Sequence, residues 1–298
     1  MSEELDFNQE FITQNQKPRP IFTLSAFGDE IATELDEQLD IMLEHGVKYL
    51  DLRGVWGKNV MDLTNDELKK IDKALRVREM GVSCVASPLG KISINDPFEP
   101  ELARLERALE IADWVGSSYI RLFSFYMPSE EGPAAYPKYR SEVMRRLTEF
   151  ARASQPWGMI LLHENEKGIY GDTAERCLDV IKEVGSGNLR VVFDPANFVQ
   201  VGDKPFTTAF PLLEPHLTYL HIKDAYAATG KETVAGAGDG EIEQLLSALW
   251  ERGYQGYLGL EPHLSDSGQF SGYSGPQKFA EAVNALKQML VRLGADSL

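Results

Sequence analysis

The sequence predicts a single (β/α)8 domain, a TIM barrel of the α/β class, from three observations. One unit recurs along the chain: an amphipathic helix, a turn that contains glycine, and a short strand of apolar residues. The strands are apolar throughout rather than alternating, as expected for parallel strands that are buried on both faces. No glycine-rich nucleotide-binding motif follows the first strand, so a doubly wound open sheet is less well supported.

The expected elements follow one another at regular spacing. Strands are expected near residues 21–26, 48–52, 82–87, 118–124, 158–164, 189–194, 217–222 and 256–261, with starts 27 to 40 residues apart, about the length of a βα unit. Helices are expected at 36–45, 65–80, 100–115, 139–154, 173–184, 242–252 and 276–293. Helix C-termini carry glycines suited to a left-handed conformation, at Gly46, Gly81, Gly116, Gly158, Gly185 and Gly253. Segment 123–139 is expected to be a long loop over the barrel mouth, and 197–215 a crossover that is mostly loop.

Composition limits the functional classes. With 30 basic and 46 acidic residues, the net charge is −16, which opposes binding to nucleic acid or to an anionic membrane. No stretch approaches the roughly 20 apolar residues that span a bilayer. Residues 1–20 are polar and acidic, unlike a secretory signal, and are expected to form a tail or strap before a barrel domain at 21–298. Cys84 and Cys177 lie far apart in apolar segments, so we expect free thiols and a cytoplasmic protein.

Four consecutive strands in the second half of the chain end on side chains that can bind a metal. They end on Glu164, Asp194, His221 and Glu261. A single such residue is often only a helix cap or a hydrogen-bonded core histidine, and Asp194 before Pro195 suits a cap. Four of them at one rim of a parallel barrel instead predict a divalent-cation site. Three carboxylates and one imidazole favour Mn²⁺ or Mg²⁺, although Co²⁺ and Zn²⁺ are also compatible with this set.

The motifs around these residues resemble those of the xylose-isomerase-like TIM barrels, which include sugar isomerases, 3-epimerases and inosose-dehydratase-like proteins. The resemblance covers residue 21 to the end and rests on HEN (163–165), DPAN (194–197), HIKD (221–224), EPH (261–263) and the glycine-rich VAGAGDGEI (234–242). It implies that the four residues bind one divalent metal, with Glu164 and Glu261 as acid and base. Many members of the family carry histidine where this chain has Asn197, so a histidine–carboxylate relay at that position is in doubt.

The resemblance implies an isomerase or epimerase that acts on a small ketose or keto-polyol through a metal-bound enediolate. If the adjacent carbon carries a leaving group, the same carbanion would expel it, so a lyase acting on a keto-inositol or 3-keto-glycoside is the alternative. A non-catalytic sugar-binding protein or partner subunit is a lesser alternative. An endonuclease-IV-type repair enzyme is disfavoured by the five histidines and the acidic charge. No phosphate cradle is evident, which favours an unphosphorylated substrate, and the sequence leaves open whether the chain forms a homo-oligomer.

Further residues near the expected mouth are candidates for substrate binding. They are Asn197, His163, Glu166, Lys223, Asp224, His263, Arg121 and Trp56. Each also has a purely structural interpretation: strand alternation predicts that His163 points away from the Glu164 side, and Arg121 suits an ion pair inside the barrel. Glu30 is expected at the mouth if the first strand ends near Ala26, although it would also suit the first turn of a helix.

Overall fold

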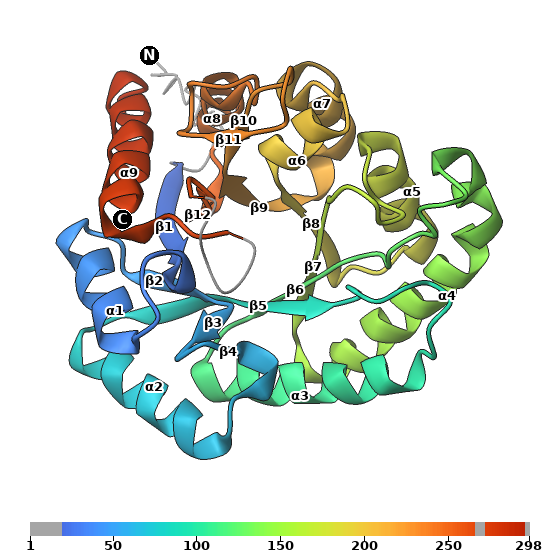
Figure 1. The fold of residues 1–298 in the computed structure, drawn as a ribbon, viewed down its shortest axis with the longest axis horizontal. Helices are drawn as coiled ribbons and strands as arrows, with labels where there is room; N and C mark the ends of the chain where they lie inside the picture. Colours follow the sequence, from blue (N-terminus) through green and yellow to red (C-terminus); the bar gives the residue numbers. More distant parts are fainter. Residues whose placement is uncertain (1–19, 266–271, 296–298) are drawn as a thin grey trace, which may run out of the picture.

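The computed structural model describes residues 20–265 and 272–295, and in it eight parallel strands close into a barrel (Figure 1). The barrel strands are β1 (Ile21–Phe27), β2 (Tyr49–Leu52), β5 (Gly81–Leu89), β6 (Tyr119–Leu122), β7 (Ile160–Glu164), β8 (Leu189–Phe193), β9 (Leu217–Ile222) and β12 (Gln255–Leu260). Strand β1 pairs with β12 from Ile21↔Gln255 to Ala26↔Leu260, which closes the ring. The predicted (β/α)8 barrel is confirmed, whereas the tail expected at 1–20 lies, except for Pro20, outside the described residues.

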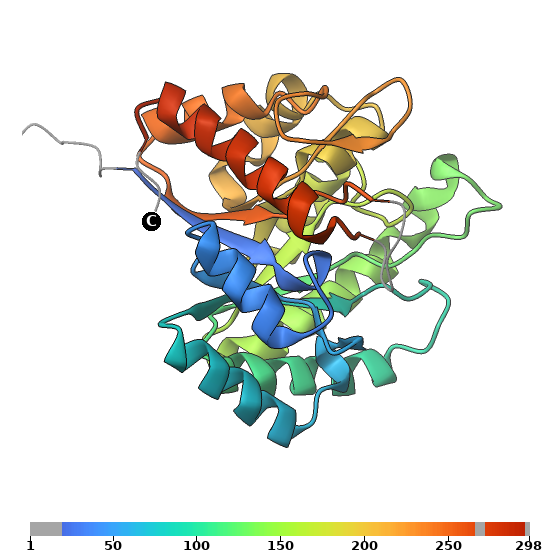
Figure 2. The ribbon, with the colours of Figure 1, turned by 60° about the vertical axis from the view of Figure 1, so that its left-hand side comes forward.

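Helices surround the barrel on its outside (Figure 1). They are α1 (Leu35–Glu44), α2 (Asn65–Val77), α3 (Glu99–Val115), α4 (Tyr136–Ser154), α5 (Ala174–Val184), α6 (Pro195–Gln200), α7 (Phe210–Leu213), α8 (Ile242–Glu251) and α9 (Gly275–Arg292). The first and last long helices, α1 and α9, lie side by side along one flank (Figure 2), where Lys287 Nζ donates to the carbonyl of His45 at 2.7 Å. Two short hairpins, β3 (Gly54–Val55) with β4 (Lys58–Asn59) and β10 (Asp224–Ala225) with β11 (Glu232–Thr233), follow barrel strands β2 and β9.

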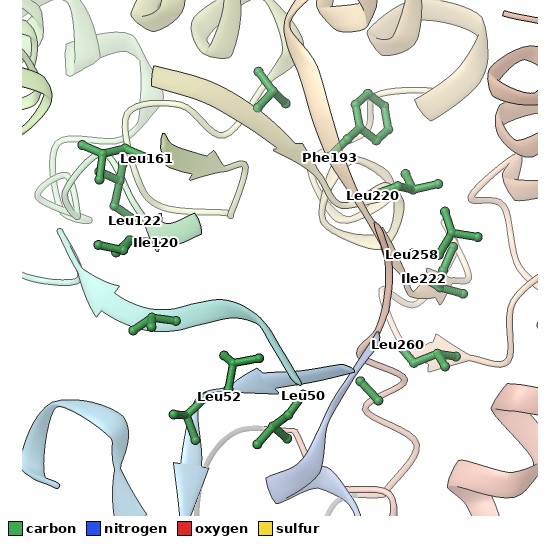
Figure 3. Close-up of a cluster of buried hydrophobic side chains, with 14 of the residues drawn as sticks. Leu50, Leu52, Ile120, Leu122, Leu161, Phe193, Leu220, Ile222, Leu258 and Leu260 are labelled. Atoms are coloured by element: carbon green, nitrogen blue, oxygen red, sulfur yellow. The ribbon is translucent and has the colours of Figure 1, made fainter. Parts of the chain in front are cut away.

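Apolar side chains fill two layers. The larger layer lies between the strands and the helices, and its members on the strands point away from the barrel interior (Figure 3). It includes Leu50, Leu52, Ile120, Leu122, Leu161, Phe193, Leu220, Ile222, Leu258 and Leu260. A second, smaller cluster consists of Cys84, Leu162, Val192 and Tyr219. Because side chains alternate along a strand, residues two positions after Leu162, Val192 and Tyr219 share their side of the sheet, at the carboxyl rim.

Several predicted boundaries need correction. Helix α2 ends at Val77 rather than at residue 80, because Glu79 takes the left-handed conformation (φ 54°) and Met80 N–H returns to the carbonyl of Leu75 at 3.0 Å. Gly81 was expected to be that left-handed residue, but it opens β5 instead. Helix α4 begins at Tyr136, three residues earlier than expected, so the preceding loop is shorter.

The crossover at 197–215 is mostly helical, contrary to the prediction of a loop. It contains the end of α6, a π-turn (Pro205–Ala209), α7 and a 3-10 turn (Glu214–His216). Each of these short elements has a proline at its first or second position. Proline suits the first turn of a helix but interrupts a longer one, so the usual sequence signal of a continuous helix is missing.

None of the helices in the described part of the chain combines the length and the apolar character that a membrane-spanning helix needs.

Candidate metal centre

The four predicted ligands converge at the carboxyl rim of the barrel. Glu164, Asp194, His221 and Glu261 are buried, and each offers one ligand atom that lies within 4.8 Å of the other three. His221 Nδ1 is 3.4 Å from Glu164 Oε1, 3.4 Å from Glu261 Oε2 and 3.9 Å from Asp194 Oδ2. The convergence follows from strand alternation, since Glu164, Asp194 and His221 each come two residues after a member of the smaller apolar cluster.

Asp194 combines the two roles that the sequence left open. Its Oδ1 accepts the backbone N–H of Asn197 at 3.0 Å and so caps helix α6. Its Oδ2 faces the ligand cluster and accepts from Lys223 Nζ at 3.1 Å. The backbone of Asp194 is fixed as well, because the side chain of Asn165 pairs with both its N–H and its carbonyl at 2.9 Å. A cap therefore holds this carboxylate in place for the cluster, and the two interpretations are compatible.

Buried cations balance the carboxylates. Arg121 Nη1 lies 3.1 Å from Glu164 Oε2 and 3.7 Å from Glu261 Oε1, and its other nitrogens donate to the carbonyls of Ala86 and Ser87. Lys223 Nζ lies 3.8 Å from Glu261 Oε2 in addition to its contact with Asp194. Buried carboxylates are costly unless they are paired, so these contacts are what permits so many acidic groups at one point.

The electrostatic balance keeps the two glutamates ionised. Burial alone would raise the pKa of Glu164, but Arg121 and His221 outweigh it and lower the pKa to about 2. Burial likewise opposes ionisation of Glu261, yet Lys223 and His263 hold its pKa well below the usual value. Burial would also lower the pKa of His221, but the surrounding carboxylates raise it to about 10. The cluster thus concentrates negative potential on one point, and a metal ion would compete there with the imidazole proton.

A second group of charged residues, which the sequence analysis largely missed, surrounds the far side of Glu261. Arg53 Nη1 donates to Glu261 Oε1 at 2.8 Å, and its Nε donates to Asp29 Oδ2 at 2.8 Å. His263 Nε2 lies 3.0 Å from Glu30 Oε1 and 3.4 Å from Glu261 Oε1. The pKa of His263 is raised to about 9, because Glu30 and Glu261 outweigh the effect of burial. Arg53 already places a positive charge between Glu30 and Glu261. These charged residues therefore hold the Glu261 carboxylate in position.

An aromatic ring supports both arginines. The guanidinium carbons of Arg53 and Arg121 lie 4.8 and 5.2 Å from the ring centre of Phe27, and the imidazole of His221 meets the same ring edge-on at 5.3 Å. Cations are attracted to the face of an aromatic ring, so Phe27 fixes both side chains without competing for their hydrogen bonds. The position of Arg53 could have been inferred from the sequence. It follows Asp51 by two residues, and Asp51 points into the barrel, where it accepts from the Tyr219 hydroxyl.

A cavity of about 350 Å³ opens above the cluster. Of the predicted site residues, its walls include Arg121, Glu164, Glu166, Asn197, Lys223, Glu261 and His263, and they also include the unpredicted Arg53, Asn59, Lys91, Gln200 and Glu232. Asn197 accepts from Lys223 Nζ at 3.0 Å and donates to the carbonyl of Asn165 at 2.8 Å. At the rim, Glu166 pairs with Lys91 at 2.6 Å and accepts from the Tyr126 hydroxyl at 2.9 Å. Such a polar, hydrogen-bonding wall suits a polyhydroxylated ligand.

Three predicted substrate-binding residues do not line this cavity. His163 is fully buried, lies against Gly171, and has no hydrogen-bond partner among the described residues on either ring nitrogen; burial lowers its pKa to about 4. Asp224 turns into the glycine-rich loop that follows it. Trp56 adopts a left-handed conformation (φ 54°) in the β3–β4 hairpin and packs against the outer apolar layer. Strand alternation explains why His163 points away from the cavity. The positions of Asp224 and Trp56 depend on the hairpins β10–β11 and β3–β4, which were not predicted from the sequence.

The residues present fit a divalent metal. His221 Nδ1 and Glu261 Oε2 are buried and lack a hydrogen-bond partner among the described residues, although each lies beside other ligand atoms. Buried polar atoms without partners are rare in native proteins and indicate a missing ligand or ion. Oxygen-rich donors with one imidazole suit Mn²⁺ or Mg²⁺ better than a thiophilic metal. Glu164, Asp194, His221 and Glu261 therefore form a candidate metal centre.

Comparison with known proteins agrees with this geometry. The chain matches the family described as Xylose isomerase-like TIM barrel over residues 39–289. The probable L-ribulose-5-phosphate 3-epimerase UlaE of Mycoplasma pneumoniae is 23% identical over 195 residues, which cover 63% of this chain and 62% of that protein. The chain spans less than two thirds of the length of the curated relatives that it matches first.

Solved structures show the same fold at low identity. A D-tagatose 3-epimerase-like protein superposes with a TM-score of 0.72 and 17% identity, covering 92% of this chain and 98% of the other. The probable 3-DHS dehydratase AsbF of Bacillus anthracis gives a TM-score of 0.70 and 16% identity, covering 90% and 99%. The family match, which covers most of the chain, shows that this protein belongs to the Xylose isomerase-like TIM barrel family.

Proposed function

We propose that this protein is a metal-dependent isomerase or epimerase of a small ketose or keto-polyol. One observation carries the proposal: two buried, ionised glutamates, Glu164 and Glu261, belong to one candidate metal centre and both line the cavity above it. The 3-epimerase activity in the name of the curated relative UlaE supports the same reaction class. We propose Mn²⁺ or Mg²⁺ as the cation, held by Glu164, Asp194, His221 and Glu261.

The reaction requires a proton to leave the carbon next to a carbonyl. A bound divalent cation would supply positive charge that stabilises the developing oxyanion of the substrate. Glu164 and Glu261 are the groups that move the proton, because both are ionised and reach the cavity. Arg121 holds one oxygen of Glu164, and Arg53 holds one oxygen of Glu261. Each carboxylate is thus oriented. Epimerisation follows when Glu164 removes the proton from one face of the carbon and Glu261 delivers to the other face a proton that it takes from the protonated His263, whose Nε2 lies 3.4 Å from Glu261 Oε1.

A β-eliminating lyase is the second candidate function. Elimination requires a proton donor for the departing hydroxyl in addition to the base. Lys223 and His263 line the same cavity, and the pKa of each is raised because neighbouring carboxylates outweigh the effect of burial. Both side chains therefore carry protons at neutral pH within the cavity, which suits the loss of water from a keto-polyol.

Solvent exchange distinguishes these functions. The protein is stripped with chelator, loaded with Mn²⁺, and incubated in D₂O with ketoses, inososes and 3-keto-glycosides while proton NMR follows the substrates. Metal-dependent deuterium incorporation with the hydroxyl count retained is the expected result and identifies an isomerase or epimerase. Loss of water or of an aglycone assigns the lyase. Stoichiometric metal without exchange on any sugar contradicts both and favours a non-catalytic sugar-binding protein.

A further inference from the structure

We propose that the substrate of this site carries neither a phosphate nor a carboxylate group, because the protein's own carboxylates occupy the positions that would bind one. This inference rests on the proposed function and narrows its substrate class. It separates this protein from its relative UlaE, whose name specifies a phosphorylated sugar. Three features of the described residues support it: an occupied nest of backbone amides, an acidic second cavity, and buried cations that are already paired within the protein.

The first feature is the glycine-rich loop after β9, the seventh barrel strand. In (β/α)8 barrels, a phosphate is frequently bound by the loops after strands seven and eight. Here the backbone N–H groups of Gly236, Gly238 and Gly240 converge on an anion, but that anion is Asp224, at 2.8, 3.1 and 2.8 Å. The backbone N–H of Ala225 donates to the same carboxylate at 2.8 Å. Convergent amides of this kind form an anion-binding nest, and this nest is filled from within the chain.

The loop has closed tightly around the Asp224 carboxylate. A β-carbon added to Gly238 would lie 2.4 Å from Asp224 Oδ1, and one added to Gly240 would lie 2.6 Å from the same oxygen. Both distances are far below van der Waals contact, so the backbone approaches the carboxylate as only glycine allows. No room is left for a phosphate beside Asp224, and a phosphate could enter only by displacing it.

The second feature is the cavity next to this loop. It has a volume of about 510 Å³, and Asp203, Asp224, Asp239, Glu241 and Glu243 line it. Lys204 is the single basic residue among the described residues of its wall. Glu241 also caps the π-turn, since its carboxylate accepts the N–H groups of Phe206 and Thr207 at 2.8 and 2.9 Å. A phosphate dianion would be repelled here, so the larger cavity does not replace the filled nest.

The third feature is that the buried and half-buried cations of the substrate cavity are already paired within the protein. The nitrogens of Arg53 donate to Asp29, Glu261 and the carbonyl of Gly272, and those of Arg121 donate to Glu164 and two carbonyls. Lys223 binds Asp194 and Asn197, while Lys91 pairs with Glu166. At these buried positions a substrate anion would have to break a pair and leave a buried carboxylate without its partner, which is costly. The remaining cation of the wall, Lys167, is exposed, so it offers a substrate anion only a charge that solvent and salt screen. Hydroxyl groups can instead accept and donate at the edges of the same pairs.

Matched sugar pairs test the inference on the Mn²⁺-loaded, full-length protein. D-fructose is compared with D-fructose 6-phosphate, and L-ribulose with L-ribulose 5-phosphate, by the rate of deuterium exchange. We expect kcat/KM to be at least about 100-fold higher for the free sugar of any pair that exchanges, since an unpaired buried charge costs several factors of ten. Preference for the phosphorylated sugar in either pair overturns the inference and leaves the proposed function intact. Absence of exchange with all four sugars counts against the proposed function, and phosphate binding then decides the inference.

Calorimetric titration with inorganic phosphate needs no turnover. Asp224→Ala empties the nest and should bind phosphate at least about tenfold more tightly than the unmodified protein. Asp239→Asn is the matched control, because Asp239 lines the same cavity but accepts from Ala227 N–H outside the nest; its phosphate affinity should equal that of the unmodified protein. Equal phosphate binding by the unmodified protein and Asp224→Ala overturns the inference. Asp224→Ser, whose shorter side chain also withdraws from the nest, replaces Asp224→Ala if circular dichroism shows that the latter is unfolded.

Discussion

The two halves of the barrel differ in what they bring to the rim. Strands β7, β8, β9 and β12 lead to the four candidate metal ligands, whereas β2 and β6 lead to Arg53 and Arg121, which face two of those ligands. Each desolvated carboxylate needs a counter-charge. The half of the barrel that carries the ligands supplies Lys223 and His263 beside Glu261, but Glu164 depends on Arg121 from the other half. The candidate metal centre is therefore an electrostatic unit of the whole barrel, assembled from residues more than 200 positions apart such as Arg53 and Glu261.

Replacing Glu261 by glutamine should have the largest effect. The ligand half loses a proton acceptor and a negatively charged ligand, so turnover should fall at least about 1,000-fold and metal affinity should weaken. Glu166→Gln is the matched control, because Glu166 lines the same cavity but pairs with Lys91 at the rim. We expect turnover of this variant to fall by about tenfold or less. Exchange kinetics measure turnover, metal analysis measures metal binding, and circular dichroism checks that each variant is folded. Full activity of Glu261→Gln would exclude the proposed mechanism.

Replacing Arg53 by methionine tests the dependence of one half on the other. Asp29 and Glu261 would both lose a buried partner, so the free energy of unfolding should fall by about 3–5 kcal/mol. Arg76→Met removes an exposed pair with Asp72 and should cost less than about 1 kcal/mol. Denaturant unfolding of both variants provides the comparison. If the two losses were equal, the arginine half would be dispensable to the ligand half.

His163, which lies on the opposite side of the sheet from the ligand His221, provides a pH test. His163 faces away from the cluster, and burial lowers its pKa to about 4, below the value of about 6.5 expected in the unfolded chain. Its contribution to stability is therefore complete above pH 6.5 and is lost as the pH falls from 6.5 to 4, by up to about 3 kcal/mol. His163→Leu should remove this part of the pH dependence when unfolding is measured across that range. An unchanged pH dependence would show that His163 is protonated in the folded protein.

The smallest effect is expected at Asn197, which contacts the cluster without belonging to it. Asn197→Ala removes the hydrogen bonds to Lys223 and Asn165, so KM should rise by about tenfold while metal remains bound. Asp194→Ala is the comparison, since that variant should lose both metal and activity. Equal metal loss from the two variants would place Asn197 among the metal ligands.

The four candidate ligands and Arg121 were predicted from the sequence, whereas Arg53 was missed and is marked only by its spacing from Asp51. Glu164, Asp194, His221 and Glu261 end apolar strands, and parallel strands bring their ends to one rim whatever the loops do. Arg53 follows a strand end too, but a Gly-containing hairpin comes next and no motif marks it. Asp224 had both a structural and a substrate-binding interpretation, and the sequence could not decide between them because its orientation depends on three glycine amides 12 to 16 residues further along the chain. Such contacts depend on backbone conformation in long loops, which residue patterns do not encode.

Gly259 shows how the layer below the metal centre bears on it. A β-carbon at this position would lie 2.9 Å from Tyr219 Cε1, 3.1 Å from Asp51 Oδ2 and 3.2 Å from His221 Cδ2. The absence of a side chain therefore lets the imidazole and the tyrosine below it occupy one narrow column. A single methyl group there would displace the imidazole relative to the three carboxylates. Any cation preference of the candidate metal centre would thus depend on a residue that offers no ligand atom, which makes Gly259→Ala a route to altering it.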